Sequence, residues 1–567
     1  MNLPYIKQYL VYAFLAIFAC IVVFIVVQSC NTASQNPSQI SQNTKTLNIA
    51  YRENVGALNP QGYNKNAMFA QNLLYEGLVR VGKNGEIIPS LATSWSVDKD
   101  GKIYTFSLRR DVLFSNGEEF NADAVVLNFK SILQNSARHS WSGLARHIER
   151  VEKLDDYGVR LVLDTPYTAT LNELALVRPF RFLAPSAFPP DLDLVAHNPQ
   201  PIGTGAYMLV ESKLGAYDIF AKNPHYWDAE RLAQDGVFYY DFVRIKVIFE
   251  PTSKMTALRA GQVDMLYGYD EIPTRIFQEA MEESMAEVDT TGNTPAIKAH
   301  LGGEAFVLSL LLNSTRLDSK IREAIALSID KPTLINAVYG ELVSPADSIY
   351  LYTDFVIPHS LRREGLRGGD KSPQSPANLT PTQYTQNLQK AREILATLGY
   401  TQANPLRLEL LFAGDKPSQK MLSQILQSQL KHTHIALHIR ALEPSMLQNR
   451  QRNGDFDIVF GESWGAPYEP LSMLFSYTAP SGHADFIAQS GLENKNEIDA
   501  LILQVVTQPN AHEAQILAHR AIDMLLQSNV YIPLAIERNK AIARSQIKGV
   551  EDISGLIYEI PVWEFWE

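Results

Sequence analysis

Histidine is suited to metal and proton chemistry, and it occurs in two notable groups in this sequence. The stretch KHTHIALHIR contains His432, His434 and His438, which a β-strand would place on one face. Imidazoles gathered on one face can bind a divalent transition metal. The residues before them have helical spacing, however, and cations near the end of a helix complement its dipole. A solvated strand face explains these histidines equally well, and we favour it over a metal site.

The second group, SARHSW, places Arg138, His139 and Trp141 within four positions. His139 has the chemistry of a metal ligand or a base, because imidazole titrates near neutral pH. The preceding residues predict a helix that is capped by Asn121 and ends near Gln134, so the group falls in the following loop. Loops carry a large share of functional side chains. The role of His139 is open on these grounds alone.

The sequence does not favour an enzyme. We find no HExxH motif and no GxSxG nucleophile elbow, so the common hydrolase constellations fail at the level of motifs. The only cysteines, Cys20 and Cys30, precede the expected folded body, which therefore has neither a disulfide nor a thiolate metal site. A formal net charge of −11 argues against a nucleic-acid partner, which requires a basic face. We expect a binding protein.

The N-terminus predicts export. An uncharged apolar run extends from Leu10 to Val27 after Lys7, and a small residue precedes Cys30 as in the lipobox of bacterial lipoproteins. Residues 1–30 are therefore either a cleaved lipoprotein signal or an uncleaved membrane anchor. Residues 31–46 are rich in Ser, Asn and Gln and predict a disordered tether. The folded body begins near Leu47.

Strands and helices alternate along the body, which predicts an α/β fold. About 520 residues are too many for one core, so at least two lobes are expected. In the first part, Asp100-Gly101 predicts a hairpin turn. Strands are expected at 104–108, 159–163, 243–249, FVLSLLLN, LRLELLFA, IALHIRAL and YIPLAIERNKAIAR, and DFDIVFGESWGAPYEP is expected as a strand that enters a loop. Helices are expected at AMFAQNLLYEGLV, KIREAIALSID, 386–398, KMLSQILQSQLKHT and 511–527.

Several longer motifs carry a resemblance to a known family. The run WSVDKDGKIYTFSLRRDVLFSNGEEFNADAV resembles the signature of the dipeptide, oligopeptide and nickel solute-binding proteins of ABC importers, and PIGTGAY, NPHYW and KIREAIALSID fall where that family has similar segments. The segments LNPQGYNKNAMFAQNLLYEGL, RHSW, ELALVRPFRFLAPS, RQRNGDFDIVF, SWGAPYEP and GHADFIAQ resemble its nickel-binding members. The resemblance covers nearly the whole chain from Leu47 to Pro561.

The resemblance implies a two-lobed clamshell with mixed sheets, of the large periplasmic dipeptide/nickel-binding type, that closes on a hinge. We assign residues 47–292 and 528–567 to lobe 1, and residues 293–527 to lobe 2. The implied role is capture of a solute in the periplasm for an inner-membrane ABC permease. A monomer tethered to the membrane through its N-terminal segment is expected.

The resemblance also implies the residues of the cleft. It places Arg138, Trp141, Arg178, Trp464, Tyr468 and His483 around the ligand, and Tyr63 and Met68 on the floor. It uses the arginine and the tryptophan of RHSW and leaves His139 unassigned, so we expect His139 to be neither ligand nor base. For the other residues the alternatives are ordinary structural roles: ion pairs for the arginines, core packing for the apolar side chains and a solvated loop for the histidine.

Only His483 among these residues is placed to bind nickel, which prefers several nitrogen or oxygen donors. The remaining donors are then expected from a small organic chelator, such as free histidine or a carboxylate metallophore, whose carboxylates Arg138 and Arg178 would bind. The alternative is a dipeptide or oligopeptide cargo. Peptide-binding relatives carry an Asp for the peptide ammonium in the loop where SWGAPYEP has Ala466, and an ammonium buried without a carboxylate is costly. We therefore favour the nickel chelate.

Overall fold

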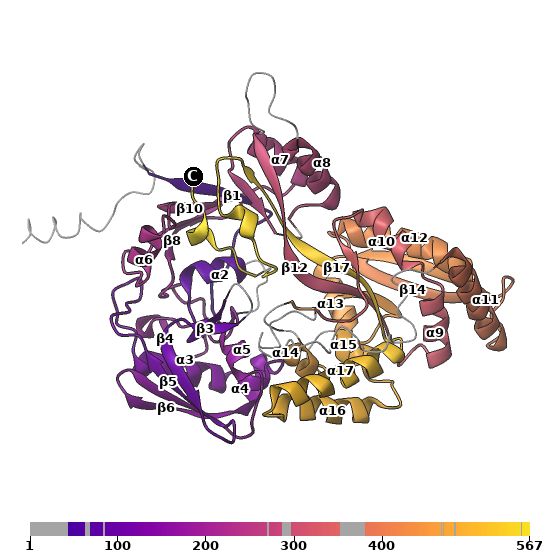
Figure 1. Ribbon diagram of the computed structural model, residues 1–567, viewed down its shortest axis with the longest axis horizontal. Helices are drawn as coiled ribbons and strands as arrows, with labels where there is room; N and C mark the ends of the chain where they lie inside the picture. Colours follow the sequence, from indigo (N-terminus) through magenta and orange to yellow (C-terminus); the bar gives the residue numbers. More distant parts are fainter. Residues whose placement is uncertain are drawn as a thin grey trace, which may run out of the picture. The chain divides into compact units, whose positions relative to one another are not determined.

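The computed structural model describes residues 44–62, 68–82, 86–268, 271–285, 296–351, 380–465, 468, 470–480, 484–556 and 558–567 (Figure 1). The apolar run, Cys30 and most of the expected tether lie outside these ranges. Among the helices that are described, none combines the length and the apolar character needed to span a bilayer. Residues Thr46–Glu567 form one compact unit, separate from Met1–Lys45.

A large mixed sheet contains both parallel and antiparallel pairs and joins strands from the whole body. Its order is β15 (Ile435–Leu442), β14 (Leu406–Ala413), β16 (Ile458–Glu462), β12 (Ile297–Leu312), β17 (Tyr531–Arg544), β11 (Met265–Tyr267), β1 (Thr46–Tyr51), β10 (Phe242–Val247), β9 (Tyr217–Lys222) and β8 (Tyr207–Lys213), with β13 (Ser344–Pro345) also paired to β17. The helices are α2 (Met68–Leu74), α3 (Ala122–Gln134), α4 (Gly143–His147), α5 (Thr170–Leu174), α6 (Ala229–Gln234), α7 (Pro251–Arg259), α8 (Thr274–Ser284), α9 (Ser319–Leu327), α10 (Lys331–Tyr339), α11 (Pro381–Thr397), α12 (Pro417–Lys431), α13 (Pro444–Arg452), α14 (Leu471–Ser476), α15 (Ala484–Gln489), α16 (Lys495–Thr507) and α17 (Ala511–Gln527).

The two long strands β12 and β17 form the centre of this sheet (Figure 1). They pair antiparallel over most of their length, with Leu310 opposite Ile532 and Ala299 opposite Ile542. The other edge of β17 pairs with β11, so the strand predicted from YIPLAIERNKAIAR returns to a strand of the expected lobe 1. The proposed lobe boundaries themselves stay a prediction.

A second, four-stranded antiparallel sheet carries the N-terminal part of the site. Its order is β4 (Ala92–Val97), β5 (Ile103–Leu108), β7 (Gly158–Leu163) and β6 (Ile148–Asp155), and a separate pair consists of β2 (Val79–Val81) and β3 (Ile87–Pro89). Gly101 has a positive φ of 69° in the turn between β4 and β5, as the hairpin prediction requires. Asn121 caps α3 by accepting from the amides of Asp123 and Ala124, at 3.1 and 3.2 Å.

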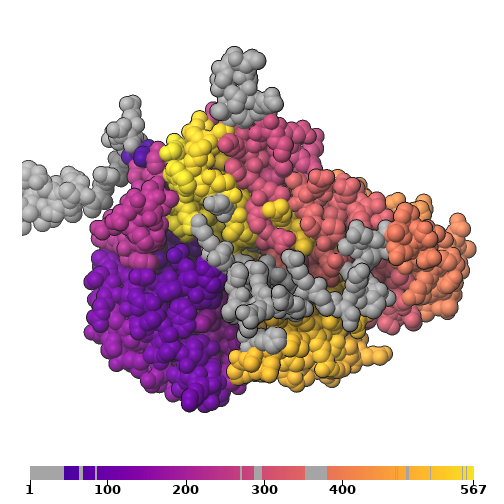
Figure 2. All heavy atoms as spheres, viewed as in Figure 1, coloured from indigo at the N-terminus to yellow at the C-terminus, as the bar shows by residue number. Residues whose placement is uncertain are grey.

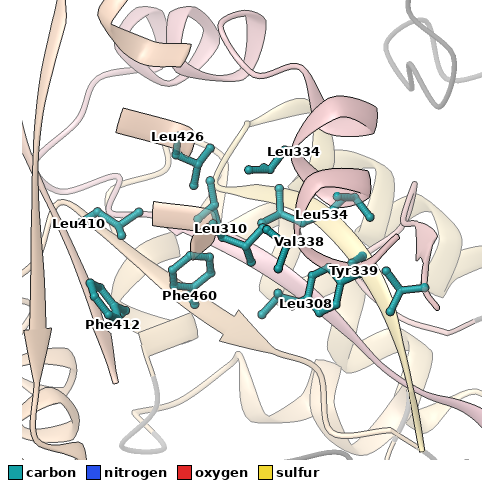
Figure 3. Close-up of a cluster of buried hydrophobic side chains, with 14 of the residues drawn as sticks. Leu308, Leu310, Leu334, Val338, Tyr339, Leu410, Phe412, Leu426, Phe460 and Leu534 are labelled. Atoms are coloured by element: carbon teal, nitrogen blue, oxygen red, sulfur yellow. The ribbon is translucent and has the colours of Figure 1, made fainter. Parts of the chain in front are cut away.

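Helices α8 to α12 cover the sheet over one continuous apolar core. Figure 3 shows Leu334, Val338 and Tyr339 of α10 facing side chains of β12, β14 and β16, with Leu426 of α12 beside them. This core explains the apolar spacing seen in the helical segments. The helix expected from Gln386 begins instead at Pro381, because Thr380 and Gln383 form a capping box.

Candidate functional site

The turn that carries Trp141 lies between a short 3-10 helix and the capped start of α4. Helix α3 ends at Gln134, and residues Ser136–His139 form a short 3-10 helix before the chain reaches Trp141. Ser142 then caps α4 by accepting from the amide of Ala145 at 3.0 Å. The half-buried Trp141 is therefore held between two ordered helical turns.

A buried carboxylate fixes this turn from below. Glu173 on α5 has no exposed surface and accepts from the amides of Gly143 and Leu144 at 3.3 and 3.0 Å, and from the hydroxyls of Ser142 and Tyr167. Burial raises the pKa of Glu173, while these hydrogen bonds lower it. Sequence reasoning missed Glu173, since an acidic residue in a short helix gives no signal of such a role.

His139 is fully buried beneath the same turn. Burial, followed by the charges of Arg138 and Arg178, lowers the pKa of His139 from 6.5 to about 4. The imidazole is therefore neutral at physiological pH. These surroundings support the prediction that His139 is neither a metal ligand nor a base.

The two arginines of RPFRF have different environments. Arg181 is only 5% exposed and donates to the carbonyls of Tyr75, Ala175 and Leu176, at 2.8 to 3.2 Å, and to the Glu559 carboxylate at 3.3 Å. Its guanidinium therefore has a structural role, because its donors are used in these hydrogen bonds.

Arg178 is half-buried and donates from Nη1 to the carbonyl of Gly62 at 2.9 Å. Gly62 directly precedes Tyr63, so this bond brings Arg178 to the chain segment that carries the expected floor of the cleft. The charges of Arg178 and Arg181 both act on Tyr468. Arg178 therefore stands between the N-terminal segment and the loop after β16.

That loop carries Trp464 and Tyr468 and depends on a glycine. Gly465 has a positive φ of 70°, and a Cβ there would lie 2.2 Å from the carbonyl oxygen of Ala305. Only glycine fits this close approach to β12. Tyr468, at 5% exposure, folds back with its amide donating to the Gly465 carbonyl at 3.0 Å. Burial raises the pKa of its hydroxyl to about 12, with the two arginines opposing the increase.

Four rings from distant parts of the chain meet at one place, which we call the aromatic cluster: Trp141, Trp464, Tyr468 and Tyr558. The ring centroids of Trp141 lie 5.5 Å from Trp464 and 5.9 Å from Tyr468. Tyr468 lies 5.8 Å from Trp464 and 5.7 Å from Tyr558. The structure thus brings together three expected site residues and adds Tyr558, which lies in an irregular segment without a periodic signal.

Arg138 has a partner of its own. Its guanidinium forks onto the Asp193 carboxylate, with Nη1 to Oδ1 at 3.2 Å and Nη2 to Oδ2 at 3.4 Å, and its side chain is 43% exposed. This is the bidentate geometry that the resemblance assigned to a chelator carboxylate. Binding of a chelator by Arg138 stays a prediction.

The remaining expected residues are only partly described. Tyr63, His483 and Ala466 lie outside the described residues. Met68 is described and is 2% exposed at the start of α2. Its position just after the Tyr63 segment agrees with a place beneath the site, and its contact with a ligand stays a prediction.

The rival histidine site has no support. His432 follows the last residue of α12, and His434 and His438 lie before and within β15, where His438 is exposed. Within the described residues, no three His, Cys, Asp or Glu side chains form a group that could hold a metal. Only His438 lies on the strand, whereas His432 follows α12 and His434 lies in the turn with a positive φ of 66°, so the expectation that one strand face carries all three histidines is wrong.

One serine motif corrects the sequence interpretation. GESWG, residues 461–465, has the GxSxG spacing that the sequence analysis overlooked. An elbow requires a strand that turns directly into a helix. Here β16 leads into the loop of Trp464, and α14 begins only at Leu471. Ser463 is 6% exposed and its hydroxyl accepts from the Val307 amide at 2.8 Å, so it anchors the loop to β12.

Segments assigned to different lobes touch beside the aromatic cluster. Phe475 and Val506 pack into the core of the four-stranded sheet. Thr168 donates from its amide to the Val506 carbonyl at 2.8 Å and from its hydroxyl to the Gln508 carbonyl at 2.7 Å. In Figure 2, the violet surface of the N-terminal part adjoins the yellow surface of the α16 region. The two parts are in contact in this conformation.

With this geometry in place, comparison with known proteins identifies the class. The sequence model described as "Bacterial extracellular solute-binding proteins, family 5 Middle" matches residues 86–485, and the chain belongs to this family. Membership confirms the expected recognition, the α/β fold with mixed sheets and a binding protein of the ABC-importer type rather than an enzyme.

Three relatives illustrate the range of similarity. The chain is 34% identical over 521 residues to the nickel-binding periplasmic protein of Escherichia coli (strain K12), covering 89% of this chain and 91% of the relative. It is 25% identical over 475 residues to di/tripeptide-binding protein 2 of Pseudomonas aeruginosa (strain UCBPP-PA14), covering 79% and 78%. The solved structure of NikA from Brucella suis in complex with Fe(III)-EDTA has a TM-score of 0.78 and 33% identity, and covers 92% of this chain and 99% of that chain.

Proposed function

We propose that this protein captures nickel(II) as a complex with a small organic chelator, histidine or a carboxylate metallophore, between its two lobes, and delivers it to the permease of an ABC importer. The observation that carries the proposal is the aromatic cluster beside Arg178. The rings come from segments expected in different lobes, as a ligand held at a clamshell closure requires. The similarity to a nickel-binding periplasmic protein supports the metal.

In this proposal the protein recognises the chelator more than the ion. Trp141, Trp464 and Tyr468 offer flat faces that would enclose a planar chelate and exclude water. The planar guanidinium of Arg178 would bind a chelator carboxylate, because such charge-assisted pairs fix both orientation and energy. Arg138 would also bind a chelator carboxylate, either together with the Asp193 carboxylate or in its place. The solved structure of a relative in complex with Fe(III)-EDTA, a metal polycarboxylate, supports a metal chelate as the ligand.

His483 would supply the single metal bond from the protein, through neutral imidazole. Tyr63 and Met68 would form the floor of the site. We further propose that the protein acts in the periplasm as a monomer, held at the membrane by a lipidated Cys30 or an uncleaved N-terminal helix. Each of these roles follows from the resemblance of the motifs.

Calorimetric titration of the full-length protein in mild detergent tests the proposal. Nickel with excess histidine should bind tightly, whereas nickel alone and metal-free dipeptides should not. His483→Ala and Arg178→Ala should each weaken binding, and Arg259→Ala, which removes an exposed arginine paired with Glu283 at 2.8 Å, should serve as the matched control. Tight binding of dipeptides without metal would instead support the peptide cargo suggested by the di/tripeptide-binding relative.

A pH series separates the role of His483 from that of the chelator. Affinity should fall as pH drops from about 7 to about 6, because protonated imidazole cannot bind the metal. The His483→Ala variant should lack that part of the decrease. Equal pH profiles for the two proteins would remove His483 from the site.

A further inference from the structure

A second cavity, of about 360 Å³, lies between α8, α10 and α12 and reaches strands β12, β16 and β17. Its lining includes Phe306 and Leu308 on β12, and Tyr339 at the end of α10, which Figure 3 shows beside Leu308. No residue of the aromatic cluster lines this cavity. The cavity is therefore separate from the proposed chelate site.

A lysine on β17 is the notable feature of this cavity. Lys540 on β17 lines it and is only 3% exposed. Its ammonium makes no hydrogen bond or ion pair with the part of the chain that the structure describes. A cation that is largely withdrawn from water and lacks an anionic partner favours a nearby anion. Lys540 thus provides a positive charge that an anion in the cavity would compensate.

The other cations of the lining have carboxylates nearby. Arg52 forms an ion pair with Asp415 at 3.5 Å, and Lys416 forms one with Glu462. These pairs compensate the charges of Arg52 and Lys416. Lys540 therefore differs from the cations around it.

Glu537, Tyr339 and Arg275 are further polar groups of the lining. Glu537 is 6% exposed, and burial, followed by the charge of Glu537, raises the pKa of the Tyr339 hydroxyl. That hydroxyl is buried and lies close to the side chains of Glu537 and Ser418, which both influence its pKa. Arg275 at the mouth is 81% exposed and pairs with Glu279 at 3.5 Å. The charge of Arg275 is therefore compensated as well, and the Tyr339 hydroxyl lies beside the Glu537 carboxylate.

Two helices begin at the cavity. Pro273 and Thr274 of α8, and Lys416 and Pro417 of α12, belong to its lining. The helices are 11 and 15 residues long, and neither start has a side-chain cap. Uncapped helix starts present free amides and a positive dipole end, which favour anions. They reinforce the charge of Lys540.

We propose that this cavity binds a small oxyanion, a carboxylate or inorganic phosphate, paired with the Lys540 ammonium and with the first free amides of α8 and α12. The anion would bridge elements assigned to lobe 1 and lobe 2. The site requires neither nickel nor a chelator, so it stands or falls independently of the proposed function.

Calorimetric titration of the metal-free, full-length protein with sodium phosphate and, separately, sodium succinate tests the site at ionic strength held constant with chloride. Saturable binding of one ion per chain is expected for at least one of them, and the comparison identifies the preferred oxyanion. Lys540→Met should lower the affinity at least about tenfold, as the loss of a charge-assisted pair implies. Lys390→Met on α11, an exposed lysine paired with Glu323, should leave it unchanged.

A pair of variants at the mouth keeps the test independent of the stability of Lys540→Met. Ala337 is exposed on α10 and lines the cavity, so Glu and Gln are both tolerated there. Ala337→Glu should bind the anion at least about threefold more weakly than Ala337→Gln, because only charge differs between them. Absence of saturable binding, or an unchanged affinity in Lys540→Met, overturns the proposal. Equal affinities for the Ala337 pair overturn it where Lys540→Met does not fold.

Discussion

Acidification should destabilise this protein through His139 in a calculable way. The folded state holds the pKa of His139 at about 4, whereas the unfolded chain has the ordinary value of 6.5. Between these values the unfolded chain binds a proton that the folded chain does not, so stability falls as pH falls. The difference corresponds to a loss of about 2 kcal/mol between pH 7.5 and pH 5, and of about 3 kcal/mol by pH 4.

Urea unfolding at pH 7.5 and pH 5, for the wild type and His139→Gln, measures this contribution. The variant is expected to be less stable at both values, because it alters a fully buried site, but its loss between them should be about 2 kcal/mol smaller. His197→Gln, which changes a 49% exposed histidine paired with Asp191, should retain the wild-type decrease. Parallel decreases in the wild type and His139→Gln would refute the burial argument.

Three further substitutions test the architecture of the site. Glu173→Ala should lower the free energy of unfolding by about 3 kcal/mol, because several buried donors lose their acceptor. It should also alter the near-ultraviolet circular dichroism that Trp141 contributes. An unchanged urea midpoint would contradict this prediction. Gly465→Ala should cost about 2 kcal/mol through the clash with Ala305 and weaken chelate binding, as measured by thermal unfolding and calorimetry. Arg181→Ala should cost about 3 to 5 kcal/mol, measured by urea unfolding, because it leaves Glu559 and buried carbonyls unpaired; near-neutral stability would show that water replaces the guanidinium.

Much of the local structure follows from residue pattern. The cap at Asn121, the hairpin at Gly101 and the helix from Ala511 to Gln527 are all set by neighbours in the sequence, so periodicity and turn chemistry predict them. The early start of α11 was missed because its capping box lies outside the apolar repeat.

The site was harder to predict because its parts are far apart in the sequence. The motifs of Trp141 and Trp464 were found through family resemblance, and no spacing rule could pair their rings. Tyr558 and Glu173 were missed because their roles depend on tertiary contacts: the ring packs against Tyr468, and the carboxylate receives donors from another turn. Arg181 is buried and Arg178 only half-buried, so the two arginines have different roles. The RPFRF motif alone does not predict this difference.

The place of β17 has a consequence for biosynthesis. This strand occupies residues Tyr531–Arg544, after almost all other elements, yet it pairs with both β11 and β12 at the centre of the large sheet. Until it emerges, β11 and β12 lack their shared neighbour and expose unpaired edges. A nascent chain therefore cannot complete the centre of this sheet until Arg544 has been synthesised.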